Sequence, residues 1–389
     1  MASYRSFTTS PFSEAVVECM RRIYPESLAD KSFDNTGLLL EAPLNTQRQL
    51  RNSVLLTVDL TQAVADEAIE HGDSIVIAYH PIIFRGLKSI TSSNTQQTTL
   101  LRLAAEGISV YSPHTAVDAV PGGMADWLCD IVTRPRDPPR PAAGGHAVAD
   151  ELLASAKAAS PPPPPPPLPP RAESRSMASH LIFPSSQLPS PETATTGSEI
   201  PHSRSTISPN PAPPPGFENA GTGRLVSFPA PQPLGSLLRH IACGIGMPRG
   251  LPHFPLALPP NSNLDMKIST VATCPGSGSS ILMKNGKPVA DLLLTGEISH
   301  HDALAAIENG SAVVSLFHSN SERGYLGERM RRKLEAALRL EWGQMIEDLA
   351  DLPETSTSGV ADCLNDPTVD VRVSERDRDP YGIVVFPEA

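Results

Sequence analysis

The amino-acid sequence predicts an α/β protein whose two lobes are separated by a disordered, proline-rich insertion. In each half of the chain, apolar runs of strand length alternate with amphipathic runs of helix length, which is typical of parallel βαβ units. Between the halves lie seven consecutive prolines, which favour extended, disordered chain over helix or sheet. The predicted division is an N-terminal lobe at 1–133, a linker at 134–222 and a second lobe with a C-terminal helix and strand at 223–389.

The first half shows strand and helix signals in alternation. Thr61 is a favourable N-cap for a helix that follows an apolar strand, and Gly107 is a favourable end for the next helix. Parallel strands carry functional loops at their carboxyl ends, so the segments after these strands are the place to look for a site. The predicted elements are strands 53–58, 74–78 and 108–111 and helices 61–70 and 97–106.

The second half repeats this plan with different residues. Asn309 and Gly310 end one predicted helix, and an acidic tail at 366–380 is expected to be a solvated loop. The predicted elements are strands 292–295, 312–317 and 382–386, a helix at 300–308 and a long amphipathic helix at 329–349.

Chemistry-bearing side chains gather after the predicted strands of both halves. They are His80, His114, Asp118, His318 and Glu322. Imidazole nitrogen and carboxylate oxygen are the ligands that first-row transition metals take from proteins, and strand-end loops can bring them together. A single histidine next to a proline is more often structural, so the prediction of a metal site rests on the group as a whole.

Composition argues against several classes of protein. The chain has 389 residues and a formal net charge of −11, which disfavours direct binding of nucleic acid. Its five cysteines form no CxxC pair, and no apolar run is long enough to cross a membrane. We therefore expect a cytoplasmic protein without membrane contact, with a mitochondrial or nuclear location as alternatives. The hydroxyl-rich stretch 1–10 is compatible with a mitochondrial presequence or with a frayed start before a helix.

Five ordered motifs resemble the Nif-three-like family, whose members are also labelled GTP cyclohydrolase 1 type 2 homologues. Two further blocks, 223–246 and 376–386, resemble its fungal branch. The resemblance covers nearly all of the chain outside the proline-rich insertion. The five motifs are DNTGLLLE (34–41), AYHPIIFRGLKSI (78–90), VYSPHTAVDAVPGGMADWL (110–128), LLTGEISHHDAL (293–304) and LFHSNSERGYL (316–326).

The resemblance implies two similar α/β lobes, a ring-shaped hexamer in several members, and a two-metal site between the lobes. By its motifs, His80, Asp118, His318 and Glu322 match the family's metal ligands. Tyr79 stands where the family usually has a first histidine, which bears on whether one or two ions bind per protomer. The tyrosine is a weak potential ligand, because its phenol is protonated near neutral pH.

Roles for the individual residues follow from this implied site. Glu322 would bridge two ions and serve as the catalytic group, because a carboxylate has two oxygens to share. His114 would either orient Asp118 by a hydrogen bond or have a purely structural role in its loop. The metal would be Zn, Mn, Fe or Ni, since all four suit imidazole and carboxylate ligands.

The roles of three other features remain open at this point. The Gly-Ser-rich segment at 274–280 either lines the cleft or forms a plain turn between a strand and a helix. The segment 34–37 is expected to be a turn in which side chains bond their own backbone. His300 and His301 begin a helix and are expected to be structural, with an orientation toward the cleft as the alternative.

Two functions remain in competition at this point. The first is metal-dependent hydrolysis of a nucleotide-like or phosphorylated small molecule. The second is a non-enzymatic role, either in metal handling or as an interaction partner of a transcriptional adaptor, as the family's name suggests. A polyproline tract at 161–170 can also bind a protein partner or serve as a passive spacer. We expect a homo-oligomer, either a dimer or a hexamer.

Overall fold

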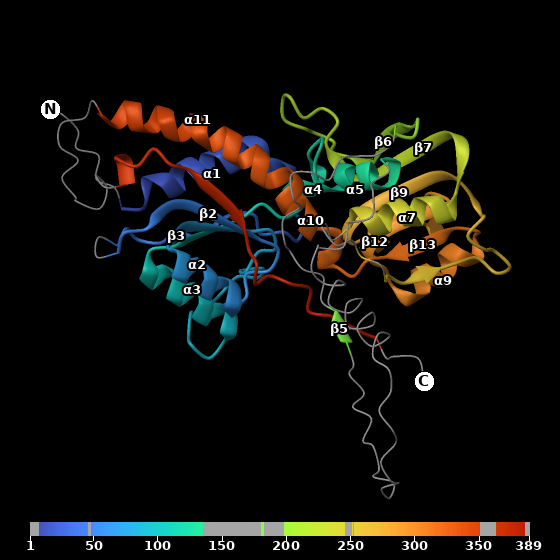
Figure 1. The fold of residues 1–389 in the computed structure, drawn as a ribbon, viewed down its shortest axis with the longest axis horizontal. Helices are drawn as coiled ribbons and strands as arrows, with labels where there is room; N and C mark the ends of the chain where they lie inside the picture. Colours follow the sequence, from blue (N-terminus) through green and yellow to red (C-terminus); the bar gives the residue numbers. More distant parts are fainter. Residues whose placement is uncertain are drawn as a thin grey trace, which may run out of the picture.

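The computed structural model describes residues 8–45, 48–134, 180–182, 198–245, 251, 253–350 and 363–385. These residues form two lobes, each built on one sheet with helices packed against it, and the lobes lie side by side (Figure 1). This architecture confirms the predicted α/β fold class. The polyproline tract and residues 1–7 lie outside the described residues.

The first lobe has a five-stranded sheet. Its elements are β1 (Gly37–Leu40), β2 (Arg51–Thr57), α2 (Gln62–His71), β3 (Asp73–Ala78), α3 (Thr95–Glu106), β4 (Ser109–Ser112) and β14 (Asp370–Val373), and the strand order is β1-β4-β3-β2-β14. Strands β2, β3 and β4 are parallel, as the sequence predicts, and β1 is an antiparallel edge strand. The side chain of Thr61 caps α2, and Gly107 ends α3 with a φ of 81°.

The C-terminal part of the chain returns to the first lobe, which corrects the predicted second lobe at 223–389. Helix α11 (Arg331–Ala350) lies beside α1 (Pro11–Ile23), where Trp342 meets Phe12 edge-on with ring centroids 5.3 Å apart (Figure 1). Strand β14 pairs in parallel with β2. The expected solvated tail is therefore partly a sheet strand, in which Val371 and Val373 are buried. A four-residue strand between acidic residues has no apolar run long enough to be recognised.

The second lobe has a six-stranded sheet in the order β6-β7-β9-β12-β13-β8. Strands β9, β12 and β13 are parallel. The predicted helix at 300–308 is confirmed with the same bounds, and Ser299 caps it. The elements are β6 (Ser203–Pro209), β7 (Gly221–Pro233), α7 (Leu234–Gly244), β8 (Leu256–Ala257), β9 (Lys267–Ser277), α8 (Ser279–Leu282), β10 (Met283–Lys284), β11 (Lys287–Pro288), β12 (Leu292–Glu297), α9 (His300–Glu308) and β13 (Ala312–Ser315).

The linker predicted at 134–222 ends earlier than its composition indicates. Strand β6 lies inside that range and pairs antiparallel with β7 as the edge of the second sheet. Its only proline, Pro209, is its last residue, and an edge strand tolerates a proline there because fewer of its amides must bond a neighbour. Farther back, the short strand β5 (His180–Ile182) pairs with β15 (Ile383–Val385), which is the predicted last strand.

One continuous apolar cluster runs through both lobes and fixes them against each other. Helix α4 (Thr115–Ala119) and helix α5 (Met124–Thr133) follow the first sheet and pack against β7 and β9 of the second. The indole of Trp127 donates a hydrogen bond to Glu328 at 3.1 Å, and the hydroxyls of Tyr24 and Tyr325 are 3.1 Å apart. These buried contacts hold the strand ends of both lobes in a fixed arrangement.

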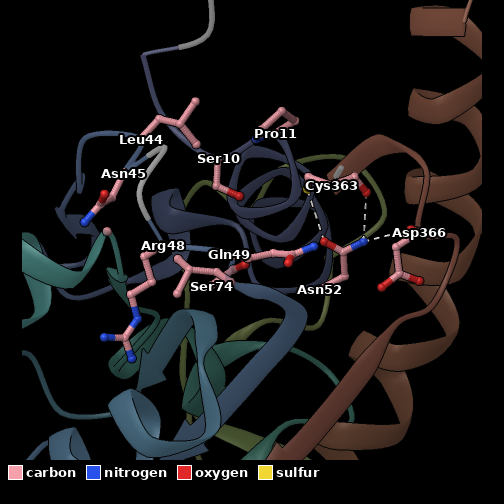
Figure 2. Close-up of a pocket in the computed structure, with 12 residues that line it drawn as sticks. Ser10, Pro11, Leu44, Asn45, Arg48, Gln49, Asn52, Ser74, Cys363 and Asp366 are labelled. Carbon is pink, nitrogen blue, oxygen red and sulfur yellow. Dashed lines mark hydrogen bonds between the residues drawn. The ribbon is translucent and has the colours of Figure 1, made fainter. Parts of the chain in front are cut away.

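A second set of contacts holds the C-terminal segment on the first lobe. The amide of Asn52 on β2 donates to the backbone carbonyls of Cys363 and Asp366 at 3.1 and 2.8 Å, and the Cys363 thiol donates back to Asn52 (Figure 2). These residues line a small cavity of about 70 Å³ that none of the predicted site residues reaches. Among the described helices, none is long and apolar enough to cross a membrane.

Candidate metal centre

A cavity of about 740 Å³ lies where strand ends from both lobes meet. His80 follows β3, His114 follows β4, and His318 follows β13, whose chain turns sharply at Phe317 with a φ of 64°. All five side chains singled out from the sequence line this cavity, together with Tyr79. The side chains that follow strands in the two halves of the chain therefore lie in one cavity, as the sequence predicts.

Three of these side chains form a group that can hold one metal ion. The ligand atoms of His80, His318 and Glu322 all lie within 4.8 Å of one another. The Nε2 atoms of the two histidines are 3.3 and 3.4 Å from the two carboxylate oxygens of Glu322. Glu322 is only 1% exposed, whereas the side chains of His80 and His318 are 22% and 40% exposed, so the carboxylate is buried beneath two rings that the cavity reaches.

Each histidine of the group is oriented by a second carboxylate. The Nδ1 atom of His80 is 2.9 Å from Asp59, and that of His318 is 2.8 Å from Glu297. A carboxylate at Nδ1 favours the tautomer with its proton on that nitrogen, which leaves Nε2 free to bind a metal. In both rings, Nε2 is the atom that faces Glu322.

A buried negative charge and open space beside it also make the site suitable for a cation. Oxygen Oε2 of Glu322 is buried without a hydrogen bond among the described residues. Burial alone would lower the pKa of His80, but the charge of Glu322 and the hydrogen bond to Asp59 outweigh it and raise this pKa well above its ordinary value. An environment that favours an extra proton on His80 favours a cation for the same reason. Gly276 leaves the space open, since a Cβ there would be 2.8 Å from Glu322 and 2.9 Å from His318.

Asp118 lies in the cavity but outside this group of three. Its two oxygens accept hydrogen bonds from the hydroxyl of Tyr79 at 2.8 and 3.0 Å. Burial and the charge of Glu322 raise the pKa of Asp118 well above its ordinary value, and burial also raises that of Tyr79. The tyrosine that replaces the usual first histidine therefore contacts the carboxylate as a hydrogen-bond donor.

His114 contacts a different carboxylate from the one expected. Its Nδ1 atom is 2.6 Å from Asp34, whereas Asp118 is bonded by Tyr79. Asp34 also accepts hydrogen bonds from the backbone and the hydroxyl of Thr115, as well as from the backbone of Asn35. Of the two roles expected for His114, the orientation of Asp118 is thus wrong, and a structural role in its loop fits these contacts. At 34–37 one local bond is present, from the backbone of Asn35, but the Asp34 side chain also bonds the distant residues His114 and Thr115. Its bonds hold the loop that precedes α4.

The Asp34–His114 contact predicts a pH dependence of stability. Burial would raise the pKa of Asp34, but the hydrogen bond and the charge of His114 outweigh it and hold this pKa below its usual 3.8. A carboxyl with a lowered pKa stabilises the fold above its unfolded pKa, and the effect is lost as pH falls through the folded value. We expect Asp34→Asn to reduce the free energy of unfolding at pH 6 and to reduce it less at pH 3. Urea titrations at both pH values test this, and an equal loss at both would contradict it.

Several residues at the site were not predicted from the sequence. Asp59 and Glu297 each follow a predicted strand by one or two residues, which is the signal that could have identified them. The segment around Gly276 lines the cavity, which decides between its two interpretations. His300 and His301 are exposed at the start of α9 and do not line the cavity.

Comparison with known proteins identifies the family. A family model for Duf34/NIF3 (NGG1p interacting factor 3) matches residues 13–348. The protein belongs to this family. The Schizosaccharomyces pombe protein NIF3 homolog is 37% identical over 330 residues, 85% of this chain and 91% of that protein. NGG1-interacting factor 3 of Saccharomyces cerevisiae is 32% identical over 327 residues, 83% of this chain and 90% of that protein.

Solved structures support the same NIF3 fold. A Staphylococcus aureus hypothetical protein superposes with a TM-score of 0.54 at 19% identity, over 96% of this chain and 99% of that one. A Bacillus cereus protein related to NIF3 gives a TM-score of 0.52 at 18% identity, over 95% of this chain and 98% of that one. At these identities the likeness concerns the fold alone. The resemblance seen in the sequence motifs is confirmed by the family model and by the two yeast relatives.

Proposed function

We propose that this NIF3-family protein is a metal-dependent hydrolase of a nucleotide-like small molecule with a planar heteroaromatic ring. The observation that carries the proposal is the group His80, His318 and Glu322 in the wall of a cavity large enough for such a molecule. Pockets for small ligands typically have volumes of about 300 to 1,000 Å³. The family's alternative label as a cyclohydrolase homologue is consistent with this class but does not establish a reaction.

In this proposal each residue of the site has its own role. His80, His318 and Glu322 would hold one divalent cation, and Asp118, which lines the same cavity, is the residue that we propose for a second. With a cation bound there, these residues would have a Lewis acid that polarises a substrate oxygen and makes water a better nucleophile at neutral pH. Glu322 carries the catalytic role because it faces both imidazoles, and Tyr79 holds the carboxylate of Asp118 in place.

Zinc, manganese, iron and nickel all suit the proposed ligands, because each accepts imidazole nitrogen and carboxylate oxygen. Cys274 also lines the cavity. Burial raises the pKa of its thiol above the ordinary value, and Cys274 is not one of the three residues whose ligand atoms converge. A site of nitrogen and oxygen ligands therefore remains.

The lining of the cavity favours a ring over a chain of phosphates. Among the described residues that line it, none is a lysine or an arginine. Phe33 and Phe84 are 52% and 45% exposed, and their ring centroids are 6.3 Å apart. Both also lie edge-on to the ring of His114, at 6.5 and 6.4 Å. Exposed aromatic rings of this kind stack against flat heteroaromatic groups.

The experiment that tests the proposal is a substrate screen with the metal-loaded full chain. Protein loaded with Mn²⁺ or Zn²⁺ is incubated with nucleosides, nucleoside mono- and triphosphates and phosphodiesters, and products are separated by chromatography. We expect turnover of a ring-containing substrate that is lost in Glu322→Gln. No turnover of any of these compounds by protein with a full metal complement would contradict the proposal.

The aromatic residues give a separate prediction about substrate binding. We expect Phe84→Ala to raise KM about tenfold with little change in kcat, because stacking of a base on an aromatic ring contributes about 1–3 kcal/mol. Steady-state kinetics on the substrate found in the screen measure this. Leu87→Ala is the matched control, since Leu87 is 43% exposed on the same segment but does not line the cavity. Equal effects of both substitutions would argue against a stacking role.

A second candidate function is interaction with a protein partner. The Saccharomyces cerevisiae relative is named NGG1-interacting factor 3, which favours a transcriptional adaptor as partner. Deletion of 161–170 in a tagged full chain, compared with Asp118→Ala, tests this by affinity purification. Partner loss in the deletion alone would favour a role for the proline-rich insertion. A homo-oligomer also remains a proposal, and sedimentation velocity of the purified protein tests it.

A further inference from the structure

The segment 374–381, here called the C-terminal strap, runs from β14 on the first lobe toward the region where the lobes meet (Figure 1). The sequence predicts a solvated loop here, yet two of its carboxylates are among the most buried in the described chain. Asp377 is 3% exposed and Asp379 is 1% exposed. The first lobe holds the start of the strap, because Ser374 donates to the carboxylate of Glu67 at 2.5 Å.

Asp377 contacts the loop that carries the partner of His80. Its Oδ2 atom accepts the backbone N–H of Val58 at 2.7 Å, and the carbonyl of Val58 in turn accepts the N–H of His80 at 3.0 Å. The next residue, Asp59, is the carboxylate that orients the His80 ring. The strap is therefore two hydrogen bonds away from one metal-binding side chain.

The same carboxylate also reaches the other half of the metal group. Asp377 forms an ion pair with Arg323, which directly follows Glu322 and is 5% exposed. Arg323 donates to the hydroxyl of Ser319 at 2.8 Å, and Ser319 directly follows His318. Ser319 donates in turn to Asp379 of the strap at 2.6 Å. Both metal-binding residues on the second lobe are thus next to residues that the strap holds.

We propose that Asp377 is a positioning residue of the metal group, because one buried carboxylate joins the loop of His80 to the loop of Glu322. It touches neither the cavity nor the proposed ligand atoms, and it acts through Val58 and Arg323. The proposal depends on the geometry of the metal group and not on hydrolysis, so a metal-binding protein without enzymatic activity would still show the effect.

The test compares two isosteric substitutions in the full chain. Asp377→Asn removes the charge that faces Arg323, whereas Glu67→Gln weakens the anchor of the strap on the first lobe, away from the metal group. Glu67 is the matched control, because it is 8% exposed and bonds the strap through Ser374 and two backbone amides. Two readouts are taken: the affinity and visible spectrum of bound Co²⁺, and amide hydrogen exchange of the metal-free protein.

We expect Asp377→Asn to weaken Co²⁺ binding about tenfold, as loss of a residue that orients metal ligands does, and to change the ligand-field spectrum. We expect exchange to rise at 57–60 and at 318–323 in this variant, and only near 370–376 in Glu67→Gln. Unchanged Co²⁺ binding and exchange in Asp377→Asn would overturn the proposal, as would equal effects of the two substitutions. If wild type binds no Co²⁺, the metal centre fails, and the exchange data still decide the positioning role.

A third variant covers the case in which Asp377→Asn does not fold. Ser319→Ala removes the hydroxyl that accepts a hydrogen bond from Arg323, the ion-pair partner of Asp377, and that donates to Asp379, so it interrupts the path from Asp377 to the loop of His318 and Glu322. We expect it to weaken Co²⁺ binding in the same direction, with faster exchange at 318–323. If Ser319→Ala had the Co²⁺ affinity and the hydrogen exchange of wild type, the proposed positioning role would be contradicted.

Discussion

Glu322→Gln is expected to reduce the affinity for a divalent cation at least about 100-fold, because loss of residues that only orient metal ligands already costs 10- to 100-fold. The amide of glutamine keeps the shape of the side chain but loses the charge that faces both imidazoles. In the wild type, Oε2 of Glu322 is buried and makes no hydrogen bond to any described residue. Isothermal titration with Zn²⁺ or Co²⁺ measures the change.

A control separates this effect from a general change of charge. Glu335 lies on α11 and pairs with Arg339 on the same helix. Glu335→Gln removes one negative charge without touching the cavity, so its metal affinity is expected to equal that of wild type. If Glu322→Gln bound metal as tightly as wild type, the three-residue site would be wrong.

Gly276→Ala is expected to abolish metal binding and also to destabilise the fold. The φ of Gly276 is 58°, and a Cβ there would be 2.8 Å from Oε1 of Glu322 and 2.9 Å from Nε2 of His318. The left-handed backbone alone costs an alanine roughly 1–2 kcal/mol. The added methyl group would also occupy space beside the two ligand atoms. Metal titration and thermal unfolding are measured on the same preparation.

Gly286→Ala supplies the matched control for this substitution. Gly286 has a φ of 74°, and a Cβ there would meet nothing within 4 Å. The two variants therefore share the backbone cost but differ in the crowding of the site. We expect Gly286→Ala to lose stability and keep metal affinity. Metal binding retained in Gly276→Ala would show that the ion lies elsewhere.

The positions of His80 and His318 at strand ends were predictable because the signals for the strands are local. Apolar runs before His80 and His318 indicate buried strands, and parallel strands bring their carboxyl ends to one edge. The capping residues Thr61 and Gly107 likewise predict helix ends from two or three neighbouring positions. Where the energetic reason for an element lies within a short stretch of chain, the sequence was sufficient.

The remaining features depend on contacts between distant segments. Strand β14 is only DVRV inside an acidic tail, and it is stable because β2 offers a free parallel edge. Aspartate is usually a surface residue, yet Asp377 is buried, where it forms an ion pair with Arg323. The partner of His114 could not be predicted either, because Asp34 is 80 residues away in sequence. The implied metal site had suggested Asp118 as one possible partner, and the structure shows Asp34 instead.

The most direct test of the metal centre is X-ray absorption spectroscopy of the full-length wild-type protein loaded with Zn²⁺. The site described here predicts a first shell of nitrogen and oxygen at about 2.0–2.2 Å, with the outer-shell scattering of the two imidazoles of His80 and His318 and no sulfur. A sulfur shell at about 2.3 Å, or a shell without imidazole scattering, would contradict the assignment of His80, His318 and Glu322 as the ligands.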